Sequence, residues 1–347
     1  MVAGAGVIVY RNGAEVYADF FGVRSLKKNK PVTRATRFRA ASVSKLFTIF
    51  TIMQLVERGR INLDADAGEY LGFKTGASVR DLASHTSGLR DGKIYSIPPN
   101  FSVEEFFKPD GKFFENGAHF GDRNFCYSNL NYGLLGTIIE AVTGERFDIY
   151  QRENILSQLD IRADYVVGNL GAGEFENLGA VYLNGKATDE FDVQPKRDTV
   201  ALQNPYAENF NGVCSLKNYR AGTNATIFSP QGGLRISFEE LTHALEMLMG
   251  GGKFRGRQIL SAESVAEIFK SHWIYDGANG DTCGGEMLNY GLGSYVIDGG
   301  FAGHAGEAFG MLSGIFFKGT SGFVYMMNGE DFALENALRN FARGLAE

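Results

Sequence analysis

The sequence predicts an α+β protein with one antiparallel sheet of at least five strands built from both chain termini. Helices flank this sheet, and a helical lobe is inserted between its two halves. Three observations lead to this fold class: strand-like runs lie near both ends, helical patterns fill the middle, and 347 residues exceed the size at which one core usually stops growing. The chain is therefore expected to form two lobes.

The N-terminal part predicts a hairpin followed by a buried helix. Residues 5–11 and 15–21 are strand-like and flank Asn12-Gly13, the dipeptide that best fits a tight type I′ turn. After a polar connection, apolar residues cover nearly the whole circumference of the segment 42–59. Such a pattern is typical of a helix that is buried on all sides.

The middle of the chain is helical first and irregular later. A short helix is expected around residues 79–84 and a longer one over residues 130–142, which Gly144 ends. Residues 163–226 show no sustained helical period and contain repeated Gly and Asn. This stretch is interpreted as loops and short strands that cover or shape a cleft.

The C-terminal third returns to regular elements. Ser237 and Glu240 have the spacing of a capping box, which predicts a helix to Met249, and Ser261 starts a second helix that ends near Ser271. Three strand-like runs and a last helix follow, over residues 290–297, 311–317, 323–327 and 331–345.

The order of these elements divides the chain into three parts. An α/β sheet domain is expected from residues 1–63 and 227–347, and a helical domain from residues 64–162. Residues 163–226 form the loop-rich insertion. The cleft is expected between the two lobes, where the insertion would help to select the substrate.

Composition excludes several functional classes. The chain has 34 Lys and Arg against 40 Asp and Glu, a net charge of −6, and so lacks the excess of cations that binding to nucleic acid requires. Its three cysteines are far apart and lack metal-ligand spacing. No zincin, P-loop, nucleophile-elbow or EF-hand pattern occurs. We therefore expect no metal, no cofactor and no nucleic acid partner.

The sequence leaves two alternatives for the compartment. No run of about 18 apolar residues occurs, so no transmembrane segment is predicted, and residues 1–4 lack the basic start and apolar core of a signal peptide. The chain is strand-like almost from its first residue, which would also follow the removal of a leader. A periplasmic or cell-surface location is expected if a leader has been removed, and a cytoplasmic one otherwise. The oligomeric state stays open.

The first candidate for chemistry is Ser42-Val43-Ser44-Lys45, at the start of the buried helix. Residues i and i+3 share a helical face, so the Ser42 hydroxyl and the Lys45 amine are expected within hydrogen-bonding reach. A serine becomes a nucleophile when a neighbouring base takes its proton, and desolvation lowers the pKa of a lysine enough to help. In isolation, a serine N-cap followed by a surface lysine would be the commoner explanation.

The second candidate is Tyr127-Ser128-Asn129, just before the helix of residues 130–142. In an extended turn, positions i and i+2 point the same way, so the phenol and the amide are expected to project together. A tyrosine near a lysine can have a lowered pKa and pass a proton, while an asparagine can hold a substrate amide. Taken singly, a packed tyrosine and a capping asparagine would be the commoner explanation.

The third candidate is the segment 303–307, Gly-His-Ala-Gly-Glu, which is expected to stand before a strand. Its small residues would let a substrate approach the backbone closely. His304 on its own is typical of a structural histidine. The functional argument therefore rests on the three candidates together: on their order along the chain and on the helix, turn or strand at which each is expected.

With these motifs the chain resembles the serine β-lactamase and penicillin-binding protein superfamily. Within it, the chain is similar to the class C β-lactamase-like branch, which includes DD-peptidases and family VIII esterases. Tyr127 and Asn129, in place of the Ser-Asp-Asn of class A relatives, indicate this branch. The likeness covers nearly the whole chain and is carried by residues 6–9, 38–45, 81–89, 127–133, 229–234, 290–293 and 304–306. It implies the β-lactamase/transpeptidase-like fold.

The resemblance also implies a role for each candidate residue. Ser42 would be the acylated nucleophile, and Lys45 and Tyr127 the proton-transfer pair. Asn129 would contact the substrate, and the backbone N–H groups of Ser42 and Glu307 would form the oxyanion hole. The remaining substrate-binding positions would be His304, Ala305 and Gly306.

Two departures from the family pattern bear on the substrate. Most class C β-lactamases carry, at the position of His304, a lysine that helps to hold the substrate carboxylate, and a histidine is neutral for much of the time near pH 7. A Glu307 side chain that points at the cleft would repel a terminal carboxylate and favour a free amine or a neutral ester. The hallmark segment 85–89 is interpreted as architectural.

The expected function is that of a serine acyl-enzyme hydrolase of the D-alanyl-D-alanine carboxypeptidase or β-lactamase type. It would cleave the amide of a peptide or a β-lactam through an ester on Ser42. Two alternatives stay open: a family VIII-type carboxylesterase or D-aminopeptidase, and a penicillin-binding sensor that is acylated without turnover. The expected partner is a small molecule or peptide, such as a peptidoglycan stem peptide, a β-lactam or an ester.

Overall fold

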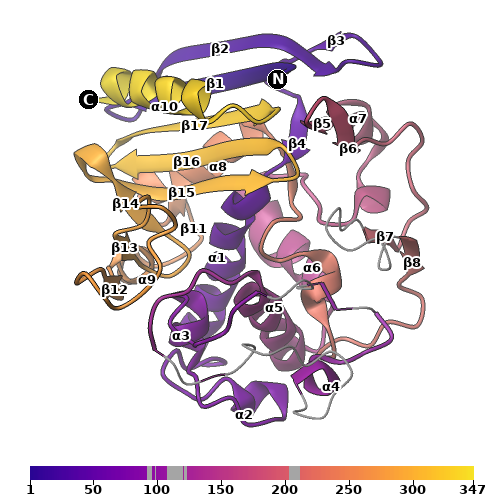
Figure 1. The fold of residues 1–347 in the computed structure, drawn as a ribbon, viewed down its shortest axis with the longest axis vertical. Helices are drawn as coiled ribbons and strands as arrows, with labels where there is room; N and C mark the ends of the chain where they lie inside the picture. The colour runs from indigo at the N-terminus through magenta and orange to yellow at the C-terminus, as the bar shows by residue number, and fades with distance from the viewer. Residues whose placement is uncertain (92–95, 98, 108–119, 121–122, 203–211) are drawn as a thin grey trace.

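The computed structural model describes residues 1–91, 96–97, 99–107, 120, 123–202 and 212–347. A seven-stranded antiparallel sheet lies at one end of the molecule (Figure 1), in the order β14-β15-β16-β17-β1-β2-β3. Both chain termini lie near it. Its strands are β1 (Gly4–Arg11), β2 (Ala14–Ser25), β3 (Lys30–Pro31), β14 (Tyr295–Ile297), β15 (Phe301–Ala308), β16 (Met311–Lys318) and β17 (Ser321–Asn328). The predicted α+β class, with an antiparallel sheet of at least five strands from both termini, is confirmed.

Strand β1 joins the two ends of the chain in the interior of this sheet. It pairs with β2 through the predicted hairpin, in which Asn12 and Gly13 have φ values of 53° and 78°, and with β17 on its other edge. The side chain of Ile8 packs in the core shared with α8 (Phe238–Met249), and Val7 packs in the core shared with α10 (Phe332–Ala346). Because successive side chains of a strand point to opposite faces, these two helices cover opposite faces of the sheet.

Helix α1 (Ser44–Glu57) leads from the sheet into the helical part of the molecule (Figure 1). Every residue from Ser44 to Leu55 is buried, so the predicted helix is indeed buried on all sides. A 3-10 turn (Ala41–Val43) precedes it, and Ser42 therefore lies just before the α-helix begins. This position leaves the Ser42 hydroxyl at the end of a rigid, buried element.

The helices of the middle of the chain lie around α1, on the part of the molecule away from the sheet (Figure 1). The predicted helices over residues 79–84 and 130–142 correspond to α3 and α5, and Gly144 ends α5 with a φ of 78°. The elements are α2 (Gly68–Leu71), α3 (Val79–Ala83), α4 (Val103–Phe107), α5 (Asn129–Thr143) and α6 (Phe147–Gln151), followed by a π-helical turn (Arg152–Leu156).

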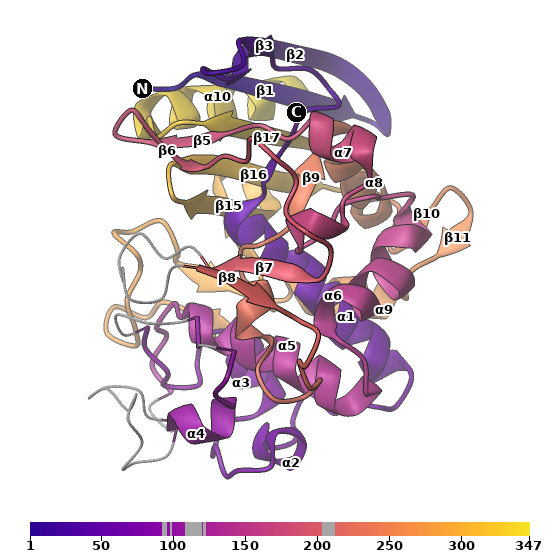
Figure 2. The same ribbon diagram turned by 90° about the vertical axis from the view of Figure 1, so that its right-hand side faces the viewer.

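The described residues of the stretch 163–226 lie along one side of the molecule, between the sheet and the helices (Figure 2). Its described part contains the expected loops and short strands, and also one short helix and two 3-10 turns that were not predicted. These are α7 (Ala172–Glu176), β5 (Val181–Leu183), β6 (Lys186–Asp189), β7 (Thr199–Leu202) and β8 (Gly212–Ser215), with 3-10 turns at Val167–Asn169 and Ala225–Phe228. The domain boundaries drawn from the sequence stay a prediction.

Two sequence assignments near the C-terminus are wrong in detail. The predicted strand over residues 290–297 divides into β13 (Asn289–Tyr290) and β14, because Gly293 turns the chain with a φ of 63°. Residues 303–307, expected before a strand, lie inside β15, where pairing with β16 outweighs the low strand propensity of Gly and Ala. The remaining elements are β4 (Arg37–Arg39), β9 (Arg235–Ser237), β10 (Lys253–Phe254), β11 (Arg257–Gln258), α9 (Ala262–Phe269) and β12 (Trp273–Ile274).

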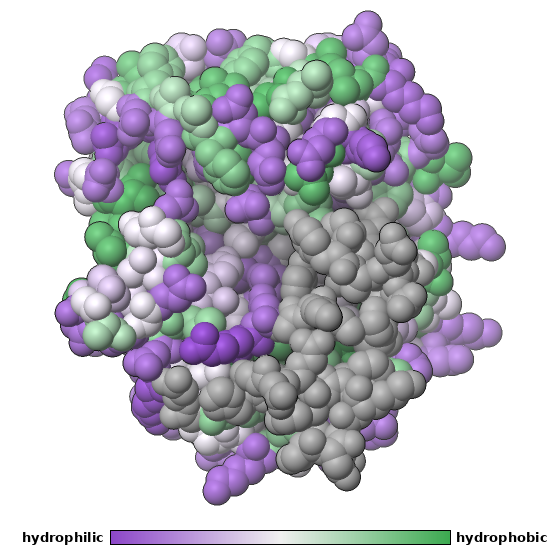
Figure 3. Space-filling model, viewed as in Figure 1, coloured by the Kyte–Doolittle hydropathy of each residue, from purple (hydrophilic) through white to green (hydrophobic). Residues whose placement is uncertain are grey.

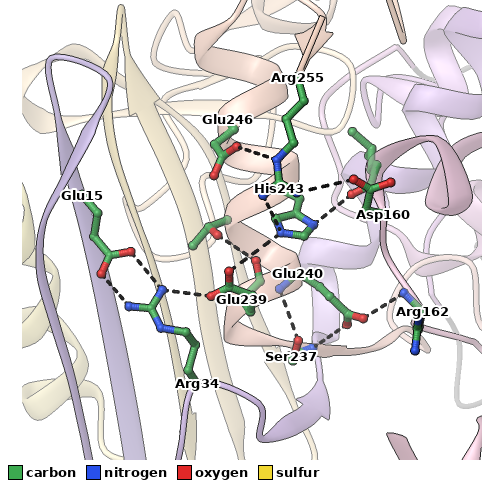
Figure 4. A network of polar contacts seen from close by, with 12 residues as sticks. Glu15, Arg34, Asp160, Arg162, Ser237, Glu239, Glu240, His243, Glu246 and Arg255 are labelled. Atoms are coloured by element: carbon green, nitrogen blue, oxygen red, sulfur yellow. Dashed lines mark hydrogen bonds and ion pairs between the residues drawn. The ribbon is translucent and has the colours of Figure 1, made fainter. Parts of the chain in front are cut away.

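A network of polar contacts holds the N-terminus of α8 (Figure 4). The predicted capping box is present: the Ser237 hydroxyl accepts a hydrogen bond from the Glu240 N–H, and the Glu240 carboxylate accepts one from the Ser237 N–H, both at 3.2 Å. The same carboxylate also accepts a hydrogen bond of 2.6 Å from the buried guanidinium of Arg37. This box therefore ties α8 to β4.

We expect Ser237→Ala to lower the free energy of unfolding by about 1 kcal/mol, because it removes the acceptor for the Glu240 N–H at the start of α8. Urea titration followed by circular dichroism measures this change. Ser237→Thr keeps an accepting hydroxyl and is the matched control. An unchanged urea midpoint for Ser237→Ala would show that the cap contributes nothing.

No helix in the described ranges is long and apolar enough to cross a membrane. On the face seen in Figure 3, hydrophilic and hydrophobic residues are intermingled. Within the same described ranges, no group of three or more His, Cys, Asp or Glu side chains is arranged to hold a metal ion.

Candidate active site

Two adjoining cavities, of about 130 Å³ and about 260 Å³, meet at Ser42. Tyr127 and Glu307 line both of them, so the structure brings the three sequence candidates together at one place. Asn129 lines the smaller cavity, and His304, Ala305 and Gly306 line the larger one. Lys45 lies beneath Ser42, without exposed surface.

Lys45 is held by three acceptors. Its Nζ atom donates to Ser42 Oγ at 3.1 Å, to Asn129 Oδ1 at 2.9 Å and to the Gln231 carbonyl at 3.3 Å. Burial lowers the pKa of Lys45 to about 7, and the negative charge of Asp91 opposes part of this effect. A substantial fraction of this amine is therefore neutral at pH 7 and can accept the proton of Ser42.

Tyr127 departs from the expectation for its acidity. Its phenol is hydrogen-bonded to Ser42, and its ring centre lies 4.6 Å from the Nζ atom of Lys45. Burial nevertheless raises the pKa of Tyr127 well above 10, and the nearby phenol of Tyr132 adds to the rise. This direction is opposite to the expected lowering, because desolvation of the partly buried phenol disfavours the phenolate more than the neighbouring groups favour it. Tyr127 is thus a neutral phenol that can donate or relay a proton.

Asn129 is fixed by a residue that the sequence analysis missed. The Asp91 carboxylate accepts hydrogen bonds from Asn129 Nδ2 at 2.7 Å and from the Asn129 N–H at 2.8 Å. It also accepts from Ser128 Oγ at 2.8 Å and from the Leu130 N–H at 3.1 Å. The only sequence signal that could have indicated Asp91 is its place two residues after the segment 85–89. Asp91 reaches the start of α5 only when the chain folds.

The buried side chain of His85 holds the same turn from another side. Its Nδ1 atom accepts a hydrogen bond from the Ser128 N–H at 3.2 Å and lies 3.1 Å from Asn131 Nδ2. Its ring centre lies 4.4 Å from that of Tyr127. These contacts of His85 support the predicted architectural role of the segment 85–89, because they hold the turn that carries Tyr127.

Strand β15 approaches Ser42 so closely that only glycine fits at position 306. A Cβ atom there would lie 2.7 Å from the Ala40 carbonyl oxygen and 2.9 Å from the Ser42 nitrogen. The Ala305 N–H is hydrogen-bonded to Tyr295 of β14, so the N–H of Glu307, two residues on, is directed to the same edge of the strand. Strand β14 pairs only with residues 301–303 of β15. The same edge of β15 is therefore not covered by β14 at residue 307, beside Ser42.

His304 is buried, with 1% of its surface exposed. Its Nε2 atom lies 2.9 Å from the Tyr290 hydroxyl, and its Nδ1 atom contacts the Ala305 carbonyl oxygen. Burial lowers the pKa of His304 to about 3, with a further contribution from Lys45. The imidazole is therefore neutral and brings no positive charge to the cavity, although direct contact with a substrate stays a prediction.

The two cavities differ in charge. Arg39 lines the smaller one and shares the single carboxylate of Asp189 with Arg235, so this buried group carries a net positive charge. Glu307 lines both cavities, and two further glutamates, Glu286 and Glu335, line the larger one together with Arg339. Burial and the neighbouring carboxylates raise the pKa of Glu307.

The protonation state of Lys45 predicts the pH dependence of any hydrolysis that takes place at Ser42. If neutral Lys45 is the base, kcat/KM for an uncharged ester is expected to rise about tenfold per pH unit at low pH and to level off above about 7. The rate rises with pH because the reactive form of Lys45 is the deprotonated amine. Stopped-flow or steady-state kinetics from pH 5 to 10 measure this profile. A rate that still rises steeply above pH 9 would indicate an ordinary lysine.

The whole chain, residues 1–347, matches the family model described as Beta-lactamase. The protein Flp of Staphylococcus aureus (strain N315) is 25% identical over 178 residues, which are 46% of this chain and 34% of Flp. A penicillin-binding protein of Bacillus subtilis (strain 168) is 27% identical over 161 residues, 43% of this chain and 35% of the relative. The matches thus span about a third of the length of these relatives.

Two solved structures share the fold. The octameric penicillin-binding protein homologue of Pyrococcus abyssi has a TM-score of 0.64 at 22% identity, covering 95% of this chain and 70% of its own. A crystal structure of a protein named SurE has a TM-score of 0.62 at 23% identity, covering 94% and 68%.

Proposed function

Because the chain belongs to the Beta-lactamase family, we propose that it is a serine acyl-enzyme hydrolase of the D-alanyl-D-alanine carboxypeptidase or β-lactamase type. One observation carries the proposal: the hydroxyl of Ser42 lies 3.1 Å from the amine of Lys45, whose pKa burial lowers to about 7. A hydroxyl in contact with a neutral, buried amine is what nucleophilic catalysis requires.

In the proposed mechanism, Lys45 takes the proton of Ser42 while the serine oxygen attacks the substrate carbonyl. The backbone N–H groups of Ser42 and Glu307 stabilise the oxyanion, a role supported by the close approach of β15 to Ser42. Tyr127, a neutral phenol hydrogen-bonded to Ser42, passes a proton to the leaving amine and is reprotonated from the lysine ammonium. Water then cleaves the Ser42 ester and restores the hydroxyl.

The charged residues that line the two cavities bear on the class of substrate. The net positive group that includes Arg39 supports a substrate whose carboxylate lies beside Arg39 and away from Glu307, which lines the same cavity; an acyl-D-Ala-D-Ala peptide and a β-lactam are such substrates. Asn129, which lines the same cavity, would contact the substrate amide. Peptidoglycan as substrate would imply a periplasmic or cell-surface location.

A second candidate function is supported by the residues that line the larger cavity. His304 is a neutral imidazole, and Glu307, Glu286 and Glu335 line the larger cavity. This arrangement favours a substrate with a free amine or a neutral ester, as a D-aminopeptidase or a family VIII-type carboxylesterase would use. His304, Ala305 and Gly306 would then line the site for the part of the substrate that lies along β15.

Activity on four substrates tests these proposals: an acyl-D-Ala-D-Ala peptide, a chromogenic cephalosporin, a short nitrophenyl ester and a D-amino acid amide. Cleavage of the peptide or the cephalosporin supports the first function, whereas cleavage of the ester or amide alone supports the second. Mass spectrometry after addition of penicillin distinguishes a third possibility, since a stable adduct on Ser42 without turnover would identify a penicillin-binding sensor. Absence of any hydrolysis and of any adduct would contradict the proposed function.

A further inference from the structure

The side chain of Asn129 is oriented from behind by Asp91. A carboxylate can only accept hydrogen bonds, so the end of the Asn129 side chain that faces Asp91 must be the Nδ2 amide nitrogen. This nitrogen donates a hydrogen bond of 2.7 Å to Asp91. The Oδ1 atom of Asn129 must then face away from Asp91, and it accepts the hydrogen bond of 2.9 Å from Lys45. Asp91, Asn129 and Lys45 therefore form a chain of two hydrogen bonds that ends at Lys45, which in turn contacts the Ser42 hydroxyl.

Asp91 is itself rigidly held. Besides the two bonds from Asn129, its carboxylate accepts from the Ser128 hydroxyl and from the Leu130 N–H at the start of α5. Four donors thus fix one carboxylate at the N-terminus of a 15-residue helix, where a negative charge is favourable. A carboxylate held in this way cannot rotate when the charge on Lys45 changes.

Asp91 is also the negative charge that faces Lys45. In the described part of the chain, the other titratable groups around this lysine are neutral near pH 7, because burial raises the pKa of the phenols and lowers the pKa of the imidazoles. These groups are Tyr127 and Tyr132 from the turn and helix α5, His85 from the segment after α3, and His304 from β15.

We propose that Asp91 is a positioning residue of the reaction, which aims the Asn129 amide oxygen at Lys45 and balances the ammonium that forms when Ser42 gives up its proton. The proposal rests on the proposed function. In the step concerned, the O–H bond of Ser42 breaks, its proton goes to Nζ of Lys45, and the freed electron pair forms the bond to the substrate carbonyl carbon. The new positive charge then lies two hydrogen bonds from the Asp91 carboxylate.

The test is the pH profile of kcat/KM for an uncharged ester in Asp91→Asn, compared with the wild-type protein. Loss of the negative charge is expected to move the midpoint about one pH unit below the wild-type value, because an opposite charge within a few ångströms favours the ammonium. If the wild-type protein is acylated without turnover, the rate of acylation gives the same profile. A purely structural role would lower the rate and leave the midpoint in place.

Ser128→Ala is the matched control, since it removes one donor to Asp91 and keeps the charge. Its midpoint is expected at the wild-type value. Should Asp91→Asn fail to fold, Asp91→Ser keeps an acceptor for the helix N-terminus without a charge and gives the same readout. A folded, uncharged variant with the wild-type midpoint overturns the inference. A wild-type protein that shows no reaction at Ser42 overturns the proposed function instead.

Discussion

Ser42→Ala is expected to lower kcat/KM by about 10⁴-fold to 10⁶-fold on any substrate that the wild-type protein cleaves. The reason is that Ser42 supplies the only covalent bond to the substrate in the proposed acyl-enzyme. In the variant, the hydrogen bond between Lys45 and Asn129 remains, but Lys45 loses the Ser42 Oγ atom as an acceptor. Steady-state kinetics measure the loss. Intact-mass spectrometry with a fluorophosphonate probe is expected to show one adduct on the wild-type protein and none on the variant.

Ser44→Ala provides the control for this experiment. Ser44 is buried two residues further along, and its hydroxyl accepts a hydrogen bond of 3.2 Å from the Leu234 N–H. Its loss is expected to cost about 1 kcal/mol of stability and to leave probe labelling intact. Full hydrolytic activity in Ser42→Ala would show that the reaction, if any, takes place at another group.

Gly306→Ala is expected to reduce kcat by about 10²-fold to 10³-fold, the loss typical of a displaced oxyanion donor. The added Cβ would lie 2.7 Å from the Ala40 carbonyl oxygen and 2.9 Å from the Ser42 nitrogen, so either β15 or the turn of Ser42 has to move. Both are backbone groups and cannot rotate away. The displacement separates the N–H groups of Ser42 and Glu307, which are proposed to bind the oxyanion together.

Gly173→Ala is the matched control for the glycine substitution. Gly173 lies in α7, and a Cβ atom there would meet no atom within 4 Å. The variant is expected to keep wild-type kcat, since alanine is at least as good as glycine in a helix. Circular dichroism should show both variants folded. Wild-type kcat in Gly306→Ala would contradict the proposed oxyanion site.

Much of the fold could be predicted because local patterns and tertiary packing agree. The hairpin at Asn12-Gly13, the helix of residues 42–59 and the capping box at Ser237 each occur where their residues indicate. Strand β15 was missed, because its glycines and alanines have low strand propensity and only the partner β16 stabilises them in this conformation.

For the candidate site, the sequence by itself determined the residues that meet at Ser42 and the short spacings that set local geometry, such as the helical i, i+3 relation of Ser42 and Lys45. Only the tertiary structure decided their protonation and orientation. The neutral phenol of Tyr127, the neutral imidazole of His304 and the hold of Asp91 on Asn129 all depend on burial and on contacts between distant segments. Desolvation and long-range hydrogen bonds have no local signature in a sequence, since both arise only when the chain has closed around the site.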